Sequence, residues 1–262
     1  MNKIALISLS GGIDSTSLLL NLLSNNYTTY ALSFNYGQKH KIEIDKAKIN
    51  ISYLKDNNYT VTHKIVDISD CMNILKSSLT NSKEDIPEGH YEETNMYSTV
   101  VPNRNAIFSS ILYGYALTIA KNKPKSKIYL SLGAHSGDHT IYPDCRIEFY
   151  KHIMKSFKLG NWNTDNIDLY LPYINLDKSQ ILEDAINSVK KLNLDFKTIF
   201  KNTITSYNPT ENGLSDGKTG SDIERILAFD KIGLKDPIKY NYSWDEVLSN
   251  AKTVESNFKQ KN

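Results

Sequence analysis

The chain has 262 residues, enough for one large domain or two small ones with a core that supports itself. Its 31 basic and 29 acidic residues nearly balance and form no long basic stripe, so we expect no direct nucleic-acid partner. Cys71 and Cys145 are the only cysteines, too few for a disulfide framework or a four-cysteine zinc site. The sequence shows no signal peptide and no apolar run of the roughly 20 residues that span a bilayer, so we expect a cytoplasmic protein without membrane contact.

Short apolar runs alternate with segments of helical periodicity over residues 1–200. The apolar runs predict strands at residues 4–9, 30–34, 61–68, 127–133 and 169–173. The periodic segments predict helices at residues 15–23, 41–54, 105–120, 147–157 and 177–192, with a tail helix near 244–258. The polar stretch 80–99 has weak periodicity, and we expect it to be a mobile loop that serves as a lid or binding segment.

This alternation predicts an α/β fold in which helices flank a parallel sheet. Ligands of such sheets bind at the carboxyl ends of the strands. The glycine turns after Leu9, Phe34 and Leu132 are therefore expected to open onto one edge of the sheet.

The first glycine turn, "SGGIDS" at residues 10–15, joins a buried strand to a helix. Such a turn aims several backbone N–H groups in one direction, and with the positive end of the helix dipole these form a phosphate cradle. The hydroxyls of Ser10 and Ser15 add donors. The alternative is an ordinary strand-to-helix turn whose glycines only satisfy backbone geometry. The sequence contains neither the G-x-x-x-x-G-K-[ST] loop of common NTPases nor the G-x-G-x-x-G fingerprint of dinucleotide binding.

Four stretches carry a resemblance to a known family. "SGGIDS" matches the S-G-G-x-D-S loop of the N-type ATP pyrophosphatases (the PP-loop superfamily) in full. "ALSFNYGQKH" (31–40), "VVPNRNAIF" (100–108) and "LGAHSGDHTIYPDCRIEF" (132–149) resemble signatures of the 7-cyano-7-deazaguanine synthases, and "YPDCR" is the most specific of them. The resemblance implies a Rossmann-like ATP-pyrophosphatase domain over residues 1–200 and a small, mostly helical lobe over 201–262.

The resemblance implies an ATP-dependent, AMP-forming carbon–nitrogen ligase that uses Mg²⁺ with its ATP. Such enzymes adenylate the carboxylate of 7-carboxy-7-deazaguanine, and ammonia then displaces AMP to give an amide. A second adenylation dehydrates the amide to the nitrile. Three alternatives stay open: a divergent paralogue that stops at the amide or joins the acid to another amine such as a protein N-terminus, a tRNA-thiolating enzyme, and a nucleotide sensor without catalysis.

Site residues follow from matched positions in the family. ATP binding is assigned to Ser10, Gly11, Gly12, Asp14, Ser15, Phe34, Asn35 and Gly133. The substrate is assigned to Gln38, Asn105, His135, Asp138, Tyr142, Asp144 and Arg146. The catalytic candidates are Arg104, Lys178, Asp14 and His40.

Each assignment rests on a chemical role. Arg104 and Lys178 would stabilise charge on phosphate. The alternatives are that Arg104 pairs with a structural carboxylate and that Lys178 is an ordinary surface residue. Arg146 could grip the substrate carboxylate with its two-pronged guanidinium. His40 and His135 could carry protons from the attacking amine.

This chain differs from the family at the C-terminal zinc site. Four cysteines normally bind a structural zinc there, whereas this chain has Ser206, Asp216, Thr219 and Asp222 at those positions. Hydroxyls and two aspartates are poor ligands for tetrahedral zinc, so we expect no zinc. The tail helix or a subunit partner would then replace its stabilising effect, and we expect a homodimer.

Overall fold

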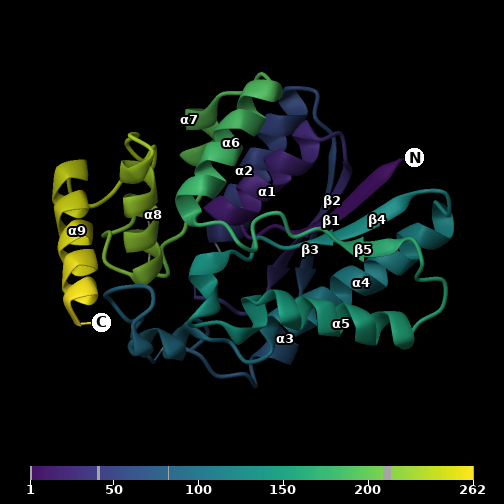
Figure 1. Cartoon of the computed structure of the whole chain (residues 1–262), viewed down its shortest axis with the longest axis horizontal. Helices are drawn as coiled ribbons and strands as arrows, with labels where there is room; N and C mark the ends of the chain where they lie inside the picture. The colour runs from purple at the N-terminus through teal and green to yellow at the C-terminus, as the bar shows by residue number, and fades with distance from the viewer. Residues whose placement is uncertain (1, 40–41, 82, 209–213, 262) are drawn as a thin grey trace.

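A parallel β-sheet forms the centre of the molecule (Figure 1). The structure, a computed structural model, describes residues 2–39, 42–81, 83–208 and 214–261. Within these residues the sheet has five strands in the order β3-β2-β1-β4-β5, and each neighbouring pair is parallel. The strands are β1 (Lys3–Ser8), β2 (Thr28–Asn35), β3 (Val61–Asp67), β4 (Lys127–Ser131) and β5 (Ile167–Leu169). The expected Rossmann-like α/β fold is confirmed.

Helices cover both faces of the sheet, as Figure 1 shows. One face carries α1 (Ile13–Ser24), α2 (Ile42–Asp56), α6 (Lys178–Lys191) and α7 (Phe196–Phe200). The opposite side carries the short α3 (Ser69–Met72), α4 (Arg104–Asn122) and α5 (Ile147–Leu159). Three 3₁₀ turns lie in the connections: η1 (Thr94–Thr99), η2 (Ser136–His139) and η3 (Pro143–Cys145). Within the described residues no helix combines the length and the apolar composition needed to span a bilayer.

The C-terminal helices α8 (Gly220–Lys231) and α9 (Trp244–Lys261) pack together at one end of the sheet (Figure 1). Helix α8 also contacts α6, and Ala228 and Phe229 of α8 belong to the same apolar cluster as α1 and α6. The tail helix is therefore where the sequence predicts it. The division into domains at residue 200 stays a prediction.

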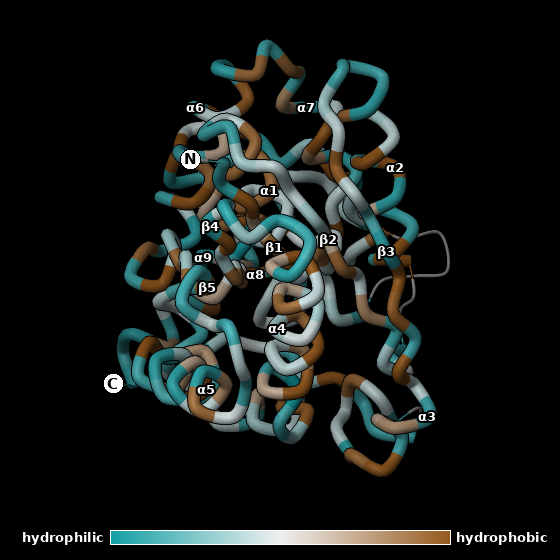
Figure 2. Tube along the Cα trace, turned by 90° about the vertical axis from the view of Figure 1, so that its right-hand side faces the viewer, coloured by the Kyte–Doolittle hydropathy of each residue, from teal (hydrophilic) through white to brown (hydrophobic). Residues whose placement is uncertain are grey.

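Successive side chains of β1 point to opposite faces of the sheet and belong to two separate layers of the apolar core. Ile4 and Leu6 belong to the layer under α4 and α5, whereas Ala5 and Ile7 belong to the layer under α1 and α6. All four side chains are fully buried, as expected for a strand covered on both faces. Helix α5, by contrast, is buried on one side, and its tube in Figure 2 passes between hydrophobic and hydrophilic colours along its turns.

Two predicted segments differ from the structure. The last strand is β5, at Ile167–Leu169 rather than 169–173. Its ladder ends at the hydrogen bond from Tyr170 N to Leu130 O, and Pro172, which lacks an N–H, cannot extend it. The stretch 80–99 contains η1, and Tyr91 and Met96 within it are buried, so its second half is part of the core.

Residues 88–91, which we call the strap, join this stretch to the C-terminal helices. Glu88 forms a β-bridge with Thr219 at the start of α8. Nε2 of His90 lies 2.9 Å from Oε2 of Glu255, and its ring stacks on Phe258 of α9 with 3.8 Å between centroids. The contacts of Glu88 and His90 thereby hold Tyr91, the last residue of the strap, in place.

Gly11, in the turn between β1 and α1, has a backbone that suits only glycine. Its φ is +94°, in the left-handed region, and a side chain there would collide with the backbone oxygen of Glu43 in α2. The glycine turn and the first turn of α2 are therefore in direct backbone contact.

Gly11→Ala is expected to lower the free energy of unfolding by about 1–2 kcal/mol or more, because left-handed backbone is costly for an L-residue and the new methyl group collides with Glu43. Gly114→Ala is the matched control. Gly114 is an exposed residue of α4 with no atom within 4 Å of an added Cβ, so alanine should raise stability by roughly 0.5–1 kcal/mol. Urea unfolding of both variants measures the difference, and a G11A protein as stable as the wild type would contradict the close contact.

Candidate active site

A pocket opens at the carboxyl ends of β1, β2 and β4. Its wall includes Ser10 and Gly12 after β1, Phe34 at the end of β2, and Leu132 and Gly133 after β4. Strand β1 lies between β2 and β4, and the helices that lead into these two neighbours, α1 and α4, cover opposite faces of the sheet (Figure 1). Ligands of parallel sheets bind at such a point. Residues that follow β1, β2 and β4 thus line one pocket, as expected for turns that open onto one edge of the sheet.

The glycine turn is held in shape by its own hydroxyls. The Oγ of Ser15 accepts a hydrogen bond from Ser10 N at 3.2 Å, and the Oγ of Ser10 accepts one from Gly12 N at 3.2 Å. Helix α1 begins directly after, so the positive end of its dipole faces the pocket. Gly133 packs against the turn, since a Cβ there would lie 3.1 Å from Ser15 N. The turn has the form of an anion cradle.

A buried ammonium group lies beside this cradle. Lys178 at the start of α6 is 4% exposed, and its Nζ lies 3.4 Å from Oδ2 of Asp14 and 2.7 Å from Oε2 of Glu224. Burial by itself lowers the pKa of Lys178, but the Asp14 and Glu224 carboxylates outweigh burial and raise it. The side chain is therefore charged, and it contacts Asp14 of the glycine turn rather than lying on the plain surface.

His135 completes this ionic cluster behind the pocket wall. Its Nε2 lies 3.6 Å from Asp138 and 3.9 Å from Asp14, and its Nδ1 lies 3.8 Å from Glu224. Burial lowers the pKa of His135, whereas the three carboxylates raise it and prevail. The Oδ1 of Asp138 in turn accepts a hydrogen bond from the hydroxyl of Tyr91 at 2.9 Å, which brings the strap to the site.

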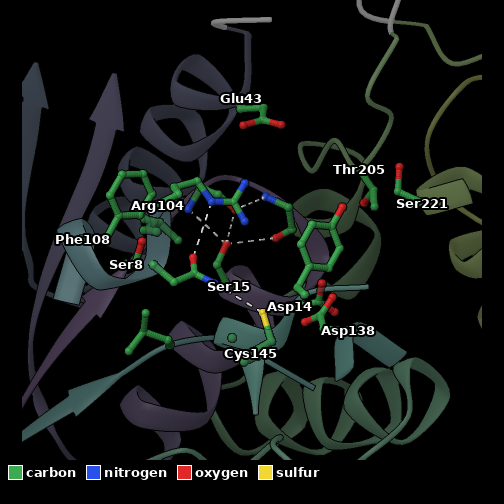
Figure 3. Close-up of a pocket in the computed structure, with 18 of the residues that line it drawn as sticks. Ser8, Asp14, Ser15, Glu43, Arg104, Phe108, Asp138, Cys145, Thr205 and Ser221 are labelled. Carbon is green, nitrogen blue, oxygen red and sulfur yellow. Dashed lines mark hydrogen bonds between the residues drawn. The ribbon is translucent and has the colours of Figure 1, made fainter. Parts of the chain in front are cut away.

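The far side of the pocket contains Arg104, at the first residue of α4, and Glu43 of α2 (Figure 3). Figure 3 shows the two on one side of the pocket, with Asp14 and Asp138 on the other. Burial raises the pKa of the Glu43 carboxyl from 4.5 to about 7, although the Arg104 guanidinium works against it. Glu43 can therefore exchange a proton near neutral pH.

Aromatic rings form another part of the pocket wall. The rings of Phe34 and Phe108 stack with 4.1 Å between centroids at an angle of 9°, and Tyr36 meets Phe108 edge to face. All three line the pocket. Such a surface suits a flat heterocycle.

Most of the predicted site residues line this pocket. They are Ser10, Gly12, Asp14, Ser15, Phe34, Gln38, Arg104, Asn105, Gly133, Asp138, Tyr142 and Lys178. Gln38 is held by its own loop, since its Oε1 accepts from Tyr36 N and its Nε2 donates to Phe34 O. Asn105 donates from Nδ2 to the Sγ of Cys145, which is buried.

Five predicted residues do not line the pocket in the structure. Gly11 and His135 lie directly behind its wall. Asn35 donates instead to Asp67, and Asp144 accepts from the backbone N–H of Asn105. Arg146 is exposed, and its Nε donates to the backbone oxygen of His139 at 2.9 Å. His40, the fourth catalytic candidate, lies outside the described residues.

The structure also adds residues that the sequence analysis does not single out: Tyr36, Glu43, Tyr91 and Tyr207 in the pocket wall, and Glu224 behind it. Tyr36 lies inside the 31–40 motif and Glu43 follows it within one helical turn, so the carboxyl end of the second strand is the signal that points to both. Glu224 lies in the segment considered only for metal ligands, and no local pattern marks it.

Three of the four positions matched to the family's zinc cysteines form a hydrogen-bonded cluster. Oδ2 of Asp222 accepts from the Oγ of Ser206 at 2.9 Å and from the Oγ1 of Thr219 at 2.6 Å. Burial raises the pKa of the Asp222 carboxyl, and these hydroxyls oppose the rise. Asp216 lies apart and accepts from Lys218 N. Among the residues that the structure describes, no three His, Cys, Asp or Glu side chains are grouped to hold a metal ion.

Comparison with known proteins settles the family. Residues 4–233 match the family described as queuosine biosynthesis protein QueC. The chain belongs to this family. It is 41% identical over 244 residues to the 7-cyano-7-deazaguanine synthase of Caldicellulosiruptor saccharolyticus, covering 92% of this chain and 98% of that protein. It is 39% identical over 240 residues to the enzyme of the same name from a Marinomonas species, covering 92% and 99%.

A third relative, the 7-cyano-7-deazaguanine synthase of Methanoregula boonei, is 40% identical over 236 residues, with 90% of this chain and 98% of that protein covered. The sequence-based prediction of a ligase of the 7-cyano-7-deazaguanine synthase type is therefore confirmed. Among solved structures, a 4-thiouridine synthetase–RNA complex with bound ATP is similar with a TM-score of 0.44 and 15% identity, over 97% of this chain and 53% of that one. A similarity this weak does not bear on function.

The purified protein is expected to contain far less than one zinc per chain, because hydroxyls stand where thiolates would bind the metal. Mass-spectrometric metal analysis measures the ratio, and EDTA should leave the Tm unchanged. Stoichiometric zinc, or a Tm that falls with EDTA, would overturn this prediction.

The raised pKa of Glu43 predicts a pH dependence of stability. The protonated carboxyl of Glu43 contributes to the free energy of unfolding. This contribution is fully present below pH 4.5, the ordinary pKa of the group, and is lost as the pH rises through about 7, the pKa of Glu43 in the folded protein. Glu43→Gln removes the titration, so the wild type should lose stability relative to E43Q across that window. Thermal melts of both proteins across the window measure it.

Glu183→Gln, which removes an exposed carboxylate from α6, controls for the change in net charge. A constant difference in Tm between wild type and E43Q at all pH values would contradict the assignment.

Proposed function

We propose that this protein adenylates the carboxylate of 7-carboxy-7-deazaguanine with ATP, and that ammonia converts the product to the amide and, after a second adenylation, to the nitrile 7-cyano-7-deazaguanine. The observation that carries the proposal is one pocket with an anion cradle and a buried cation at one end and an arginine with a titratable carboxyl at the other. Family membership and the names of the relatives support the substrate.

ATP would bind with its phosphates on the glycine turn. Ser10, Gly12 and Ser15 line the pocket there at the positive end of the α1 dipole, and Lys178 adds a positive charge. The adenosine would lie toward Phe34. Pyrophosphate, the leaving group, gains charge as the bond between α and β phosphates breaks, and a cation already held in place stabilises that charge without reorganisation.

Asp14 fits the Mg²⁺ that accompanies ATP. Its Oδ1 is buried and has no hydrogen-bond partner among the described residues, while its Oδ2 faces Lys178. The ion would neutralise phosphate charge when bound.

The substrate carboxylate would lie at the Arg104 end. The guanidinium and the N-terminus of α4 both favour an anion there. Held beside the α-phosphate, a carboxylate oxygen attacks phosphorus, pyrophosphate leaves, and the acyl carbon becomes an electrophile with AMP as its leaving group. The aromatic wall would support the flat deazaguanine ring.

Ammonia then attacks the acyl carbon, the bond to AMP breaks, and one proton must leave the nitrogen. Glu43 lies in the pocket with a pKa near 7, so its ionised form can accept that proton at neutral pH. In the second cycle the amide oxygen attacks the α-phosphorus of ATP and pyrophosphate leaves; the bond to AMP then breaks and the nitrogen loses both of its protons, which leaves the carbon–nitrogen triple bond. Each cycle converts one ATP to AMP and pyrophosphate.

The test is incubation of the pure protein with Mg-ATP, 7-carboxy-7-deazaguanine and an ammonium salt. AMP and pyrophosphate should form only when the acid is present, with the nitrile as product in the mass spectrum. An amide or a conjugate with a supplied amine would assign the chain to one of the divergent alternatives. ATP binding without turnover would overturn the ligase.

Substitution of each of two arginines tests where the substrate carboxylate binds. Arg104→Ala should lower kcat/KM for the acid by roughly 100-fold or more, because a charge-paired contact in a dry site is lost. Arg146→Ala, with its guanidinium exposed and bound to His139, should change it less than about threefold. The reverse pattern would place the carboxylate at Arg146, as the sequence alone suggests.

A further inference from the structure

Glu224 reaches the candidate site from the C-terminal helix α8, and the proposed chemistry gives it no role. Its Oε2 lies 2.7 Å from the Nζ of Lys178, closer than the 3.4 Å that separates the same nitrogen from Asp14. Lys178 is 4% exposed, so water contributes little to its solvation. Glu224 is therefore the nearest counter-charge of the cation beside the glycine turn.

The turn that carries His135 is shaped to accept this carboxylate. Oε1 of Glu224 lies 3.8 Å from the Nδ1 of His135. A side chain at Gly137, two residues on, would collide with the same oxygen. Glycine at 137 thus leaves the space in which Glu224 lies between η2 and Lys178.

The backbone of α8 is fixed on both sides of Glu224. Two residues before it, Asp222 accepts the hydroxyls of Ser206 and Thr219, and Thr219 caps the helix. Directly after it, the fully buried Arg225 binds Asp236 with 2.5 Å between Nε and Oδ2. A side chain on so constrained a turn has little freedom, which is what holding a partner in place requires.

The carboxylates of Asp14 and Glu224 both contact the ammonium group of Lys178, and the Glu224 contact affects what Asp14 can bind. If a buried ammonium group had a single carboxylate partner, it would pair with that carboxylate alone, because a desolvated charge needs a counter-charge. Glu224 provides the shorter contact to Lys178, and Oδ1 of Asp14 is buried without a hydrogen-bond partner among the described residues.

We propose that Glu224 is a positioning residue of this site: it holds the ammonium group of Lys178 beside the glycine turn and leaves Asp14 free for ligands, so that the C-terminal segment completes the adenylation site. This inference rests on the proposed function, because the step that Lys178 serves is adenylation.

Three variants test it. Glu224→Leu removes both charge and acceptor, Glu224→Gln keeps an oxygen that can accept from Lys178, and Asp230→Asn removes a carboxylate from the same helix that pairs with Lys252 of α9. We expect kcat for AMP release to fall on the order of 100-fold in E224L and about tenfold in E224Q, since small displacements of a positioned group cost that much. D230N should match the wild type, and the KM for ATP should change little.

An E224L protein with wild-type kcat would overturn the proposal. So would an E224Q protein as slow as E224L, because an amide oxygen in the right place should recover part of the rate. A higher KM for ATP with unchanged kcat would make Glu224 a contributor to uniform binding and would overturn it too.

A second measurement separates this inference from the proposed function. If the wild type releases no AMP with the acid, the proposed function fails by itself. The double-mutant cycle of Glu224→Leu and Lys178→Met on urea unfolding then decides whether the pair interacts, with Asp230→Asn and Lys178→Met as the control cycle. Additive effects in the first cycle would rule out the pairing, whereas coupling confined to the first cycle supports it.

Discussion

A desolvated ammonium group at Lys178 is the constraint on which the site depends. A charge that is 4% exposed must find its solvation in protein groups, and here Asp14 and Glu224 provide it. One of these carboxylates belongs to the glycine turn after β1 and the other to α8, while the lysine begins α6. Segments separated by more than 150 residues are thereby brought to one point. The same arrangement that satisfies the charge also aims it at the place where phosphate would bind.

Hydrogen bonds among buried polar groups connect the C-terminal segments at the positions matched to the family's zinc cysteines. Thiolates around zinc would have tied the segment near residue 206 to the start of α8. Here Ser206 and Thr219 donate to one oxygen of Asp222, which connects the same pieces through hydrogen bonds. The buried pair of Arg225 and Asp236, and the strap that pairs Glu88 with Thr219, add further connections. Hydrogen bonds among buried groups specify geometry well because each unsatisfied partner is costly.

The sheet and the glycine turn could be predicted because both depend on local pattern. Runs such as 4–9 are apolar whatever the rest of the chain does, and "SGGIDS" has its shape from its own glycines and hydroxyls. The position of β5 could not be predicted, since its ladder depends on pairing with β4 and ends before Pro172. Arg146 shows the same limit within the site. A matched motif places it beside the substrate, whereas the packing of η3 turns its guanidinium to His139 and leaves Arg104 as the arginine in the pocket.

The contact between Gly11 and the backbone of Glu43 has a mechanical consequence. No side chain lies between the two segments, so nothing soft separates the turn that would receive phosphate from the first turn of α2. A displacement of one segment must move the other, and the carboxyl group of Glu43 moves with its helix. In the proposed function this contact would couple the turn that receives phosphate to the helix that carries Glu43.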